Sequence, residues 1–205
     1  MDIGKPLIRI IDDDAAMRRS WAFLIESEEW DIKTYADAMD FIVDNDVRRP
    51  GCLVLDVNMP RMSGPELQEK MQDLGIELPI IFISGQGDID TAVHTMKHGA
   101  LDFLQKPVDA QRLLVLLRNA VRISLKNYRT ETELSEFRRK FENLTLRERE
   151  VIRRIAQGYS NRQAAEDLGI TEKTVQVHRG SVYRKLGLHN AATIARFLMR
   201  IGYPL

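Results

Sequence analysis

The chain has 205 residues, an apolar share of 44%, and equal numbers of basic and acidic side chains, 30 of each. This composition excludes a fibrous or largely disordered chain, and no apolar run approaches the roughly 20 residues of a membrane-spanning helix. The single cysteine, Cys52, excludes an internal disulfide and suits a reducing compartment. We therefore expect a folded, cytoplasmic protein with no membrane contact.

The zero net charge hides an uneven distribution along the chain. Residues 1–122 carry 14 Lys and Arg against 21 Asp and Glu, a net charge of −7. Residues 141–205 carry 11 against 6, a net charge of +5. This asymmetry suggests that only the C-terminal part of the chain meets a polyanion.

From residue 7 to about residue 122, short strand-like runs alternate with helical stretches. The strands are predicted at residues 7–11, 32–35, 52–55, 79–83 and 101–104. The helices are predicted at residues 15–27, 37–45, 64–74 and 88–98, with a fifth beginning near Asp109. This alternation predicts an α/β domain over residues 1–122, a flavodoxin-like (βα)5 fold with helices on both faces of a mainly parallel sheet.

A long helix is predicted to follow. There is no Gly or Pro between Pro107 and Gly158, and residues 109 to about 140 are rich in Leu, Arg, Lys and Glu. One helix that continues through a linker, residues 123–142, is favoured over a flexible tether, and its heptad-like apolar spacing leaves self-association open. Residues 143–205 show helical patterns without a convincing strand, which predicts a small all-α domain.

Polar residues follow four of the five predicted strands. They are Asp12, Asp13 and Asp14 after the first strand, Asp56 after the third, Ser84 after the fourth and Lys106 after the fifth. In a parallel sheet these positions share one rim, where clustered carboxylates repel one another unless a divalent cation binds. Oxygen-only ligands favour Mg2+. Asp56 could then attack a phosphoryl group, assisted by the charge of Lys106 and the hydroxyl of Ser84.

Taken singly, each of these residues has an ordinary structural explanation. Asp and Ser at strand ends commonly cap the next helix, and a lysine is commonly solvated. The order of the whole set along the chain favours the phosphoryl-accepting site. Asp14 is left without a role.

These residues resemble the receiver domain of two-component response regulators. The resemblance spans residues 5–122 and rests on the motifs at residues 10–14, 55–64, 83–85 and 103–107. It implies that Asp56 is the phosphoacceptor and that Asp13 and Asp56 bind Mg2+ directly. It also implies that Asp12 binds Mg2+ through water and that the backbone carbonyl of Asn58 is a further ligand.

The same resemblance implies a conformational switch. In the family, a hydroxyl residue at Ser84 and an aromatic residue at Phe103 change position together on phosphorylation. Lys106 precedes a proline, Pro107, whose peptide bond is usually cis.

The C-terminal residues predict a helix-turn-helix. Thr145 and Glu148 form a capping box, and a cap at Ser160 or Asn161 opens a second helix. Residues 168–170 make a tight turn, and residues 171–174 begin a third helix that would enter a DNA major groove. Along this helix Val175, Val182 and Leu186 form an inward stripe.

Residues 144–200 resemble the DNA-binding domain of the LuxR, FixJ and NarL type. The resemblance rests on residues 144–151, 158–165, 168–170, 174–179 and 185–187. It places Gln176, Val177 and Gly180 where the family reads base edges of double-stranded DNA. The positions at the phosphate backbone are Lys173, Thr174, His178, Arg179 and Lys185. Gly180 departs from the longer side chains common in the family, so it either leaves one base unread or lets the backbone approach more closely.

The two resemblances together imply that the protein is a transcriptional regulator controlled by phosphorylation and that it is not an enzyme. The implied partners are a sensor histidine kinase, double-stranded DNA, RNA polymerase and, after phosphorylation, a second copy of the chain. Two alternatives stay open: a Mg2+-dependent phosphohydrolase, and a DNA-binding protein with a vestigial receiver. Multiple turnover of a phosphoester would favour the first, and indifference to beryllofluoride would favour the second.

Overall fold

A computed structural model describes residues 4–44, 46–85 and 89–204 and divides the chain into two compact units, one ending at Tyr128 and the other beginning at Arg129. The strands are β1 (Leu7–Ile11), β2 (Asp31–Tyr35), β3 (Gly51–Asp56), β4 (Ile80–Ser84) and β5 (Asp102–Gln105). The helices are α1 (Ala15–Ile25), α2 (Ala38–Ile42), α3 (Gly64–Asp73), α4 (Ile89–Lys97), α5 (Ala110–Glu142), α6 (Leu146–Ala156), α7 (Asn161–Leu168), α8 (Glu172–Leu186) and α9 (Ala191–Arg200). Within the described ranges, no helix has the length and apolar character needed to cross a membrane.

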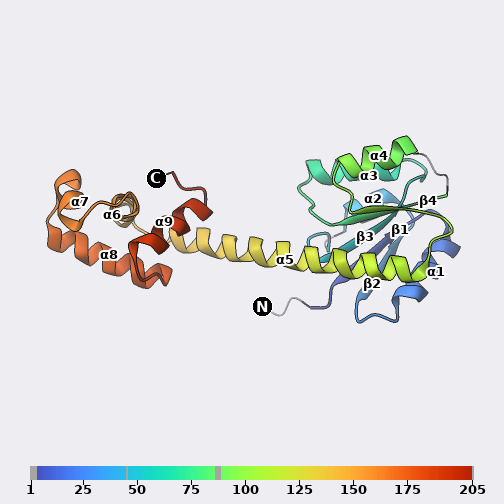
Figure 1. Cartoon of the computed structure of the whole chain (residues 1–205), viewed down its shortest axis with the longest axis horizontal. Helices are drawn as coiled ribbons and strands as arrows, with labels where there is room; N and C mark the ends of the chain where they lie inside the picture. The colour runs from blue at the N-terminus through green and yellow to red at the C-terminus, as the bar shows by residue number, and fades with distance from the viewer. Residues whose placement is uncertain (1–3, 45, 86–88, 205) are drawn as a thin grey trace. The chain divides into compact units, whose positions relative to one another are not determined.

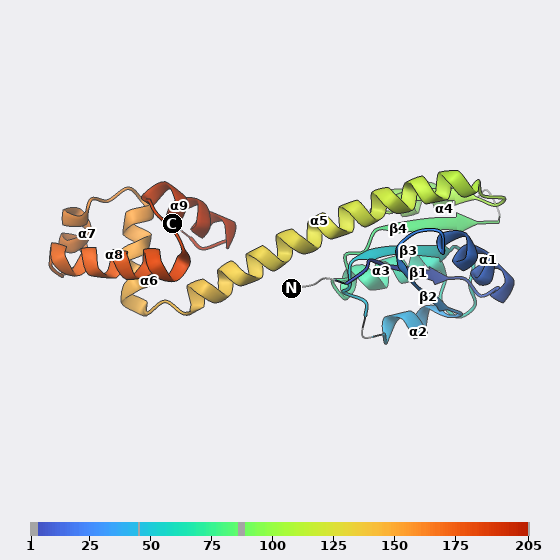
Figure 2. The ribbon, with the colours of Figure 1, turned by 90° about the horizontal axis from the view of Figure 1, so that it is seen from below.

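The first unit is a parallel sheet with the strand order β2-β1-β3-β4-β5. Helices α1 and α5 cover one face, and α2, α3 and α4 cover the other (Figures 1 and 2). The predicted α/β class and (βα)5 order are therefore confirmed.

The side chains of successive residues in each inner strand point alternately to the two faces of the sheet. In β3, Cys52 and Val54 pack with α1 and α5, whereas Leu53 and Leu55 pack with α2 and α3. Side chains alternate across a strand, and helices cover both faces, so these strands are mostly apolar along their length and lack the polar alternation of a half-exposed sheet.

Strand β3 is one residue longer at each end than predicted, because Gly51 and Asp56 interrupt the apolar pattern but not the backbone pairing. A Cβ atom on Gly51 would lie 1.8 Å from the carbonyl oxygen of Leu7, so β1 can approach only a glycine there. The helix predicted at α2 ended at residue 45, and the helix predicted at α4 began at residue 88. Both of these residues lie outside the described residues.

Helix α5 is continuous over 33 residues. Its Leu113 and Leu117 are buried in the core of the first unit, while Phe137 and Phe141 pack in the core of the second. Many of the apolar residues that gave the heptad-like spacing are therefore packed inside these two cores, so that much of the pattern is explained without self-association of the helix. The boundaries at 122/123 and 142/143 stay predictions.

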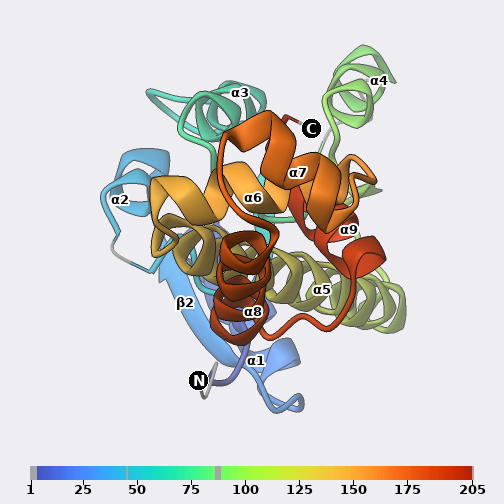
Figure 3. The same ribbon diagram turned by 90° about the vertical axis from the view of Figure 1, so that its left-hand side faces the viewer.

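The second unit joins the end of α5 to helices α6 to α9 (Figure 3). Its core is apolar and includes Val151, Ile155, Val175, Val182 and Phe197. The predicted caps are present: Thr145 closes a capping box on α6, and Ser160, one of the two residues considered, caps α7. Gly169 ends α7 with φ of 65°, a left-handed conformation that favours glycine.

Candidate functional site

The carboxyl ends of β1, β3 and β5 bring together three charged side chains. Nζ of Lys106 donates a hydrogen bond of 2.6 Å to Oδ1 of Asp56 and one of 3.2 Å to Oδ2 of Asp12. Both carboxylates are buried, with 7% of Asp56 and 3% of Asp12 exposed. The rim predicted from strand ends therefore exists for these three residues, although Lys106 and Asp12 are 94 positions apart.

Backbone groups hold the two carboxylates in place. Oδ2 of Asp56 accepts a 2.8 Å hydrogen bond from the amide of Asn58, and Oδ1 of Asp12 accepts one of 2.8 Å from the amide of Asp14. Asp14, which had no predicted role, caps α1 through its own side chain. The ordinary capping explanation thus holds for Asp14, while Asp12 and Asp56 face Lys106.

The cluster shifts the pKa of two of its members. Burial raises the pKa of Asp12, and the charge of Asp56 adds to this, against the hydrogen bonds from Asp14 and Lys106. Burial alone would lower the pKa of Lys106, but hydrogen bonds and charge from Asp56 and Asp12 outweigh it and raise that pKa. Lys106 is therefore held as a cation between two carboxyl groups.

The other predicted receiver residues lie in β4, in β5 and just after β5. Ser84 ends β4, is buried, and accepts a 2.7 Å hydrogen bond at its carbonyl oxygen from the amide of Lys106. Phe103 lies in β5, and its ring stacks on Phe82 with centroids 6.3 Å apart. The peptide bond between Lys106 and Pro107 is cis, as predicted.

Asp13 differs from its neighbours because its side chain is exposed, although its carbonyl oxygen accepts a 3.1 Å hydrogen bond from Arg18. Among the residues that the structure describes, no three His, Cys, Asp or Glu side chains are already arranged to hold a metal ion. The inferred ligand set needs only two direct carboxylates and a backbone carbonyl. Its donors are all oxygen, and two of its carboxylates are buried side by side, which fits Mg2+.

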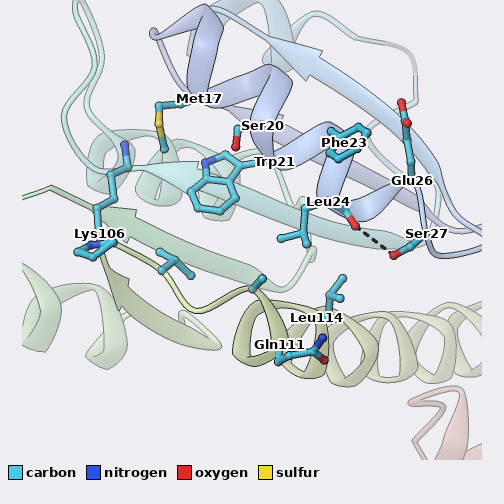
Figure 4. A pocket seen from close by; sticks show the side chains of 13 residues that line it. Met17, Ser20, Trp21, Phe23, Leu24, Glu26, Ser27, Lys106, Gln111 and Leu114 are labelled. Carbon is cyan, nitrogen blue, oxygen red and sulfur yellow. Dashed lines mark hydrogen bonds between the residues drawn. The ribbon is translucent and has the colours of Figure 1, made fainter.

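An apolar groove of about 860 Å³ opens beside Lys106, between α1 and the beginning of α5 (Figure 4). Its walls include Met17, Trp21, Phe23 and Leu114, and Phe23 is 79% exposed. Sequence patterns gave no sign of it, because the groove forms only where two helices far apart in the chain flank the sheet.

In the second unit, α8 carries the predicted DNA-contacting residues. Its N-cap is Thr171, and its inward stripe of Val175, Val182 and Leu186 is buried as predicted. Gln176 and Gly180 are exposed, and so is Val177, at 64%.

The predicted phosphate contacts differ in how their side chains are engaged. Lys173 is exposed, His178 is partly buried, and the hydroxyls of Thr174 and Thr171 lie 2.8 Å apart. Arg179 instead crosses to α7, where its Nη1 donates to Oδ1 of Asn161 at 3.1 Å. 

Lys185 is engaged with a side chain that the sequence identified only as a cap. Its Nζ donates a 2.7 Å hydrogen bond to Oε2 of Glu148, which is buried. The capping-box motif predicts the contact of Glu148 with Thr145, but nothing in the sequence pattern pairs Glu148 with α8.

The fold and these two sites define a class of protein in which a receiver domain is joined to a helix-turn-helix. The family model for the response regulator receiver domain matches residues 8–118, and the model for bacterial regulatory proteins of the luxR family matches residues 142–198. The chain therefore belongs to the response regulators of two-component systems and is a transcription regulator.

Several response regulators are similar to this chain over almost its whole length. The response regulator protein TmoT of Ectopseudomonas mendocina is 37% identical over 98% of this chain and 91% of its own length. The structure of the response regulator StyR covers 96% of this chain and all of its own, with 34% identity and a TM-score of 0.88. Full-length FixJ from B. japonicum covers 97% and 98%, with 34% identity and a TM-score of 0.57. The chain is thus a FixJ-like response regulator.

Proposed function

We propose that Asp56 accepts a phosphoryl group from a sensor histidine kinase and that this modification controls DNA binding by α8. The observation that carries the proposal is the position of Lys106, whose Nζ lies 2.6 Å from Asp56 and 3.2 Å from Asp12. An ammonium fixed beside one buried carboxylate is placed to neutralise the oxygens of an incoming phosphoryl group.

In the transfer step, one carboxylate oxygen of Asp56 attacks phosphorus while the bond from phosphorus to the donor's imidazole nitrogen breaks. The product is an acyl phosphate on Asp56, and the donor histidine leaves with the electron pair of the broken bond. Lys106 stays paired with the transferred oxygens, and the Ser84 hydroxyl donates to one of them. 

Asp12, Asp13, Asp56 and the carbonyl oxygen of Asn58 would hold Mg2+. When bound, Mg2+ supplies charge neutralisation for the phosphoryl oxygens. Lys106 orients Asp12 and Asp56 through its hydrogen bonds to both, and the amide of Asn58 donates to Asp56.

The acyl phosphate draws the hydroxyl of Ser84 toward it, and the ring of Phe103, which stacks on Phe82, changes position together with Ser84. This moves the surface of α4 and β5 and favours a homodimer. Ile89, Val93 and Met96 are exposed on α4 and give that dimer an apolar contact. 

In DNA binding, α8 enters the major groove of double-stranded DNA. Gln176, Val177 and Gly180 face base edges, and Lys173, Thr174, His178 and Arg179 lie at the phosphate backbone. The protein acts in the cytoplasm, where RNA polymerase is a further partner.

The test is DNA affinity with and without phosphoryl mimicry. Beryllofluoride with Mg2+ should raise the affinity of the full chain for its DNA sites and shift its mass in sedimentation toward a dimer. The Asp56→Asn variant should bind DNA with the basal affinity of the unmodified wild type, and beryllofluoride should not change that affinity. Genome-wide mapping of binding sites should find fewer sites for this variant than for the wild type. Equal affinity and mass under all conditions would instead favour a vestigial receiver.

A further inference from the structure

The carboxylate of Glu148 joins the beginning of α6 to two successive turns of α8. Its Oε1 accepts a 2.6 Å hydrogen bond from the hydroxyl of Ser181, and its Oε2 accepts one of 2.7 Å from Lys185. At the N-cap of α6, the amide of Thr145 donates a further hydrogen bond of 2.8 Å to Oε2. Three donors from two helices thus converge on one side chain.

This carboxylate is buried, with only 4% of Glu148 exposed. A buried charge is tolerated only when its hydrogen-bonding positions are filled, and removing one partner leaves the others unpaired. Burial alone would raise the pKa of Glu148, but the hydrogen bonds from Lys185, Ser181 and Thr145 outweigh it and lower that pKa to about 2. The carboxylate is therefore ionised in the folded protein at neutral pH.

Ser181 and Lys185 are four residues apart on α8, so the two contacts fix both the rotation of the helix and its position along its axis. A helix held by an apolar stripe alone can slide or turn more easily than one that is also hydrogen-bonded at two turns. The base-facing residues Gln176, Val177 and Gly180 lie on the same helix, and their alignment depends on that position.

We propose that Ser181 and Lys185 are positioning residues, which act through Glu148 to align α8 for reading bases, and that Lys185 is not a phosphate contact. This inference rests on the proposed DNA-binding function. The charge of Lys185 is already compensated by Glu148, so Lys185 neutralises no DNA phosphate, and its substitution leaves the number of counterions released on binding unchanged.

The two roles give different salt dependences. A phosphate contact contributes about one unit to the slope of log affinity against log salt concentration and affects all sequences alike. A positioning residue changes the affinity for a preferred sequence and leaves the slope unchanged. The probes are a duplex selected by the wild-type full chain from a random pool, and a scrambled duplex of the same composition, both with beryllofluoride and Mg2+ present.

With Lys185→Met, we expect about tenfold weaker binding to the selected duplex, unchanged binding to the scrambled duplex and an unchanged salt slope. Lys173→Met is the matched control, because Lys173 is exposed on the same helix. It should weaken binding to both duplexes and lower the slope by about one unit. If Lys185→Met behaves like Lys173→Met, or changes nothing, the inference is wrong while the proposed function stands.

Two further variants test the same contact, and the milder one, Ser181→Ala, keeps the test independent of folding defects. Ser181→Ala removes one hydrogen bond without removing a charge and should lower selectivity in the same direction, by about threefold. Glu148→Gln frees the Lys185 amine, so a phosphate contact would strengthen binding to the scrambled duplex, whereas loss of alignment weakens only selected binding. Unchanged selectivity in Ser181→Ala, or a steeper salt slope in Glu148→Gln, would overturn the inference. A wild-type chain that selects no sequence would overturn the proposed function and this inference together.

Discussion

Nζ of Lys106 lies 2.6 Å from Oδ1 of Asp56, so the side chain expected to accept a phosphoryl group already has a cation as its partner. We expect Lys106→Met to lower the free energy of unfolding of the first unit by about 1–3 kcal/mol at pH 7 without Mg2+, because Asp56 and Asp12 then face each other unneutralised. Urea titration followed by fluorescence measures this directly, since both tryptophans, Trp21 and Trp30, lie in that unit.

Mg2+ should restore more stability to the Lys106→Met variant than to the wild type, because the variant's carboxylates lack their other counter-charge. Lys97→Met, at an exposed lysine of α4, is the control. It should change neither the free energy of unfolding without Mg2+ nor the stability gained on adding Mg2+. An unchanged unfolding curve for Lys106→Met would mean that the ammonium does not offset the repulsion between the two carboxylates.

Gly64 lies against the backbone of Asp56. A Cβ atom at residue 64 would lie 2.4 Å from the carbonyl oxygen of Asp56 and 2.9 Å from Cε1 of Phe82. We expect Gly64→Ala to destabilise the first unit by about 1–3 kcal/mol and to slow phosphorylation of Asp56, because the strand end must shift. The rate of incorporation from acetyl phosphate, followed by intact-mass spectrometry, tests the second effect. Wild-type rate and stability would show that the loop relaxes freely.

Much of this fold follows from local sequence pattern. Inner strands such as β4 are apolar on both faces because helices cover both sides of the sheet, and strand ends are marked by polar residues such as Asp12 and Asp56. The rule that parallel strands share one rim then brings Asp12, Asp56 and Lys106 together without knowledge of side-chain positions.

Other features depend on tertiary contacts that leave no periodic trace. Arg9 interrupts the apolar run of β1, yet it is fully buried, and its guanidinium donates to the carbonyl oxygens of Leu7 and Arg49. The contact between Lys185 and Glu148 joins residues 37 positions apart, and a lysine near the end of a basic helix looks solvated in the sequence alone. Such pairings follow from the packing angle of two helices, which residue spacing does not encode.

Gly180 lies within α8 and has open space around it. A Cβ atom there would meet nothing within 4 Å, and the backbone needs no positive φ. We expect Gly180→Ala to stabilise the second unit by about 0.5–1 kcal/mol, since glycine costs about that much inside a helix. Thermal unfolding followed by circular dichroism measures it. If the DNA backbone or a base edge approaches Gly180 closely, the same variant should bind its selected duplex more weakly despite its higher stability.

Gln176 and Arg179 are expected to contribute to DNA binding in different ways. Gln176→Ala should reduce discrimination between the selected and scrambled duplexes, because glutamine can pair with an adenine edge. Arg179→Ala should weaken binding to both and lower the salt slope. Fluorescence anisotropy over a range of salt concentrations separates the two effects. Equal losses on both duplexes for both variants would contradict the division into base-reading and backbone-contacting residues.

The buried carboxylate of Glu148 predicts an acid-sensitive second unit. Its pKa is lowered from 4.5 to about 2 in the folded chain, because hydrogen bonds from Lys185, Ser181 and Thr145 outweigh the effect of burial. A lowered folded-state pKa contributes stability above the unfolded value, and this contribution is lost as the pH falls from about 4.5 toward 2. Its size is on the order of 3 kcal/mol.

Glu148→Gln removes this titration. The variant should be less stable than the wild type at pH 6–7, with a difference that shrinks over the pH window of about 2 to 4.5. Amide hydrogen exchange in α6 and α8 measures this stability difference, because it reports on the second unit separately from the unfolding of the first. Glu150→Gln, at an exposed position of α6, is the matched control and should show no such window. A stability difference between Glu148→Gln and the wild type that stays constant from pH 7 to pH 2 would mean that the carboxylate acts by shape and not by charge.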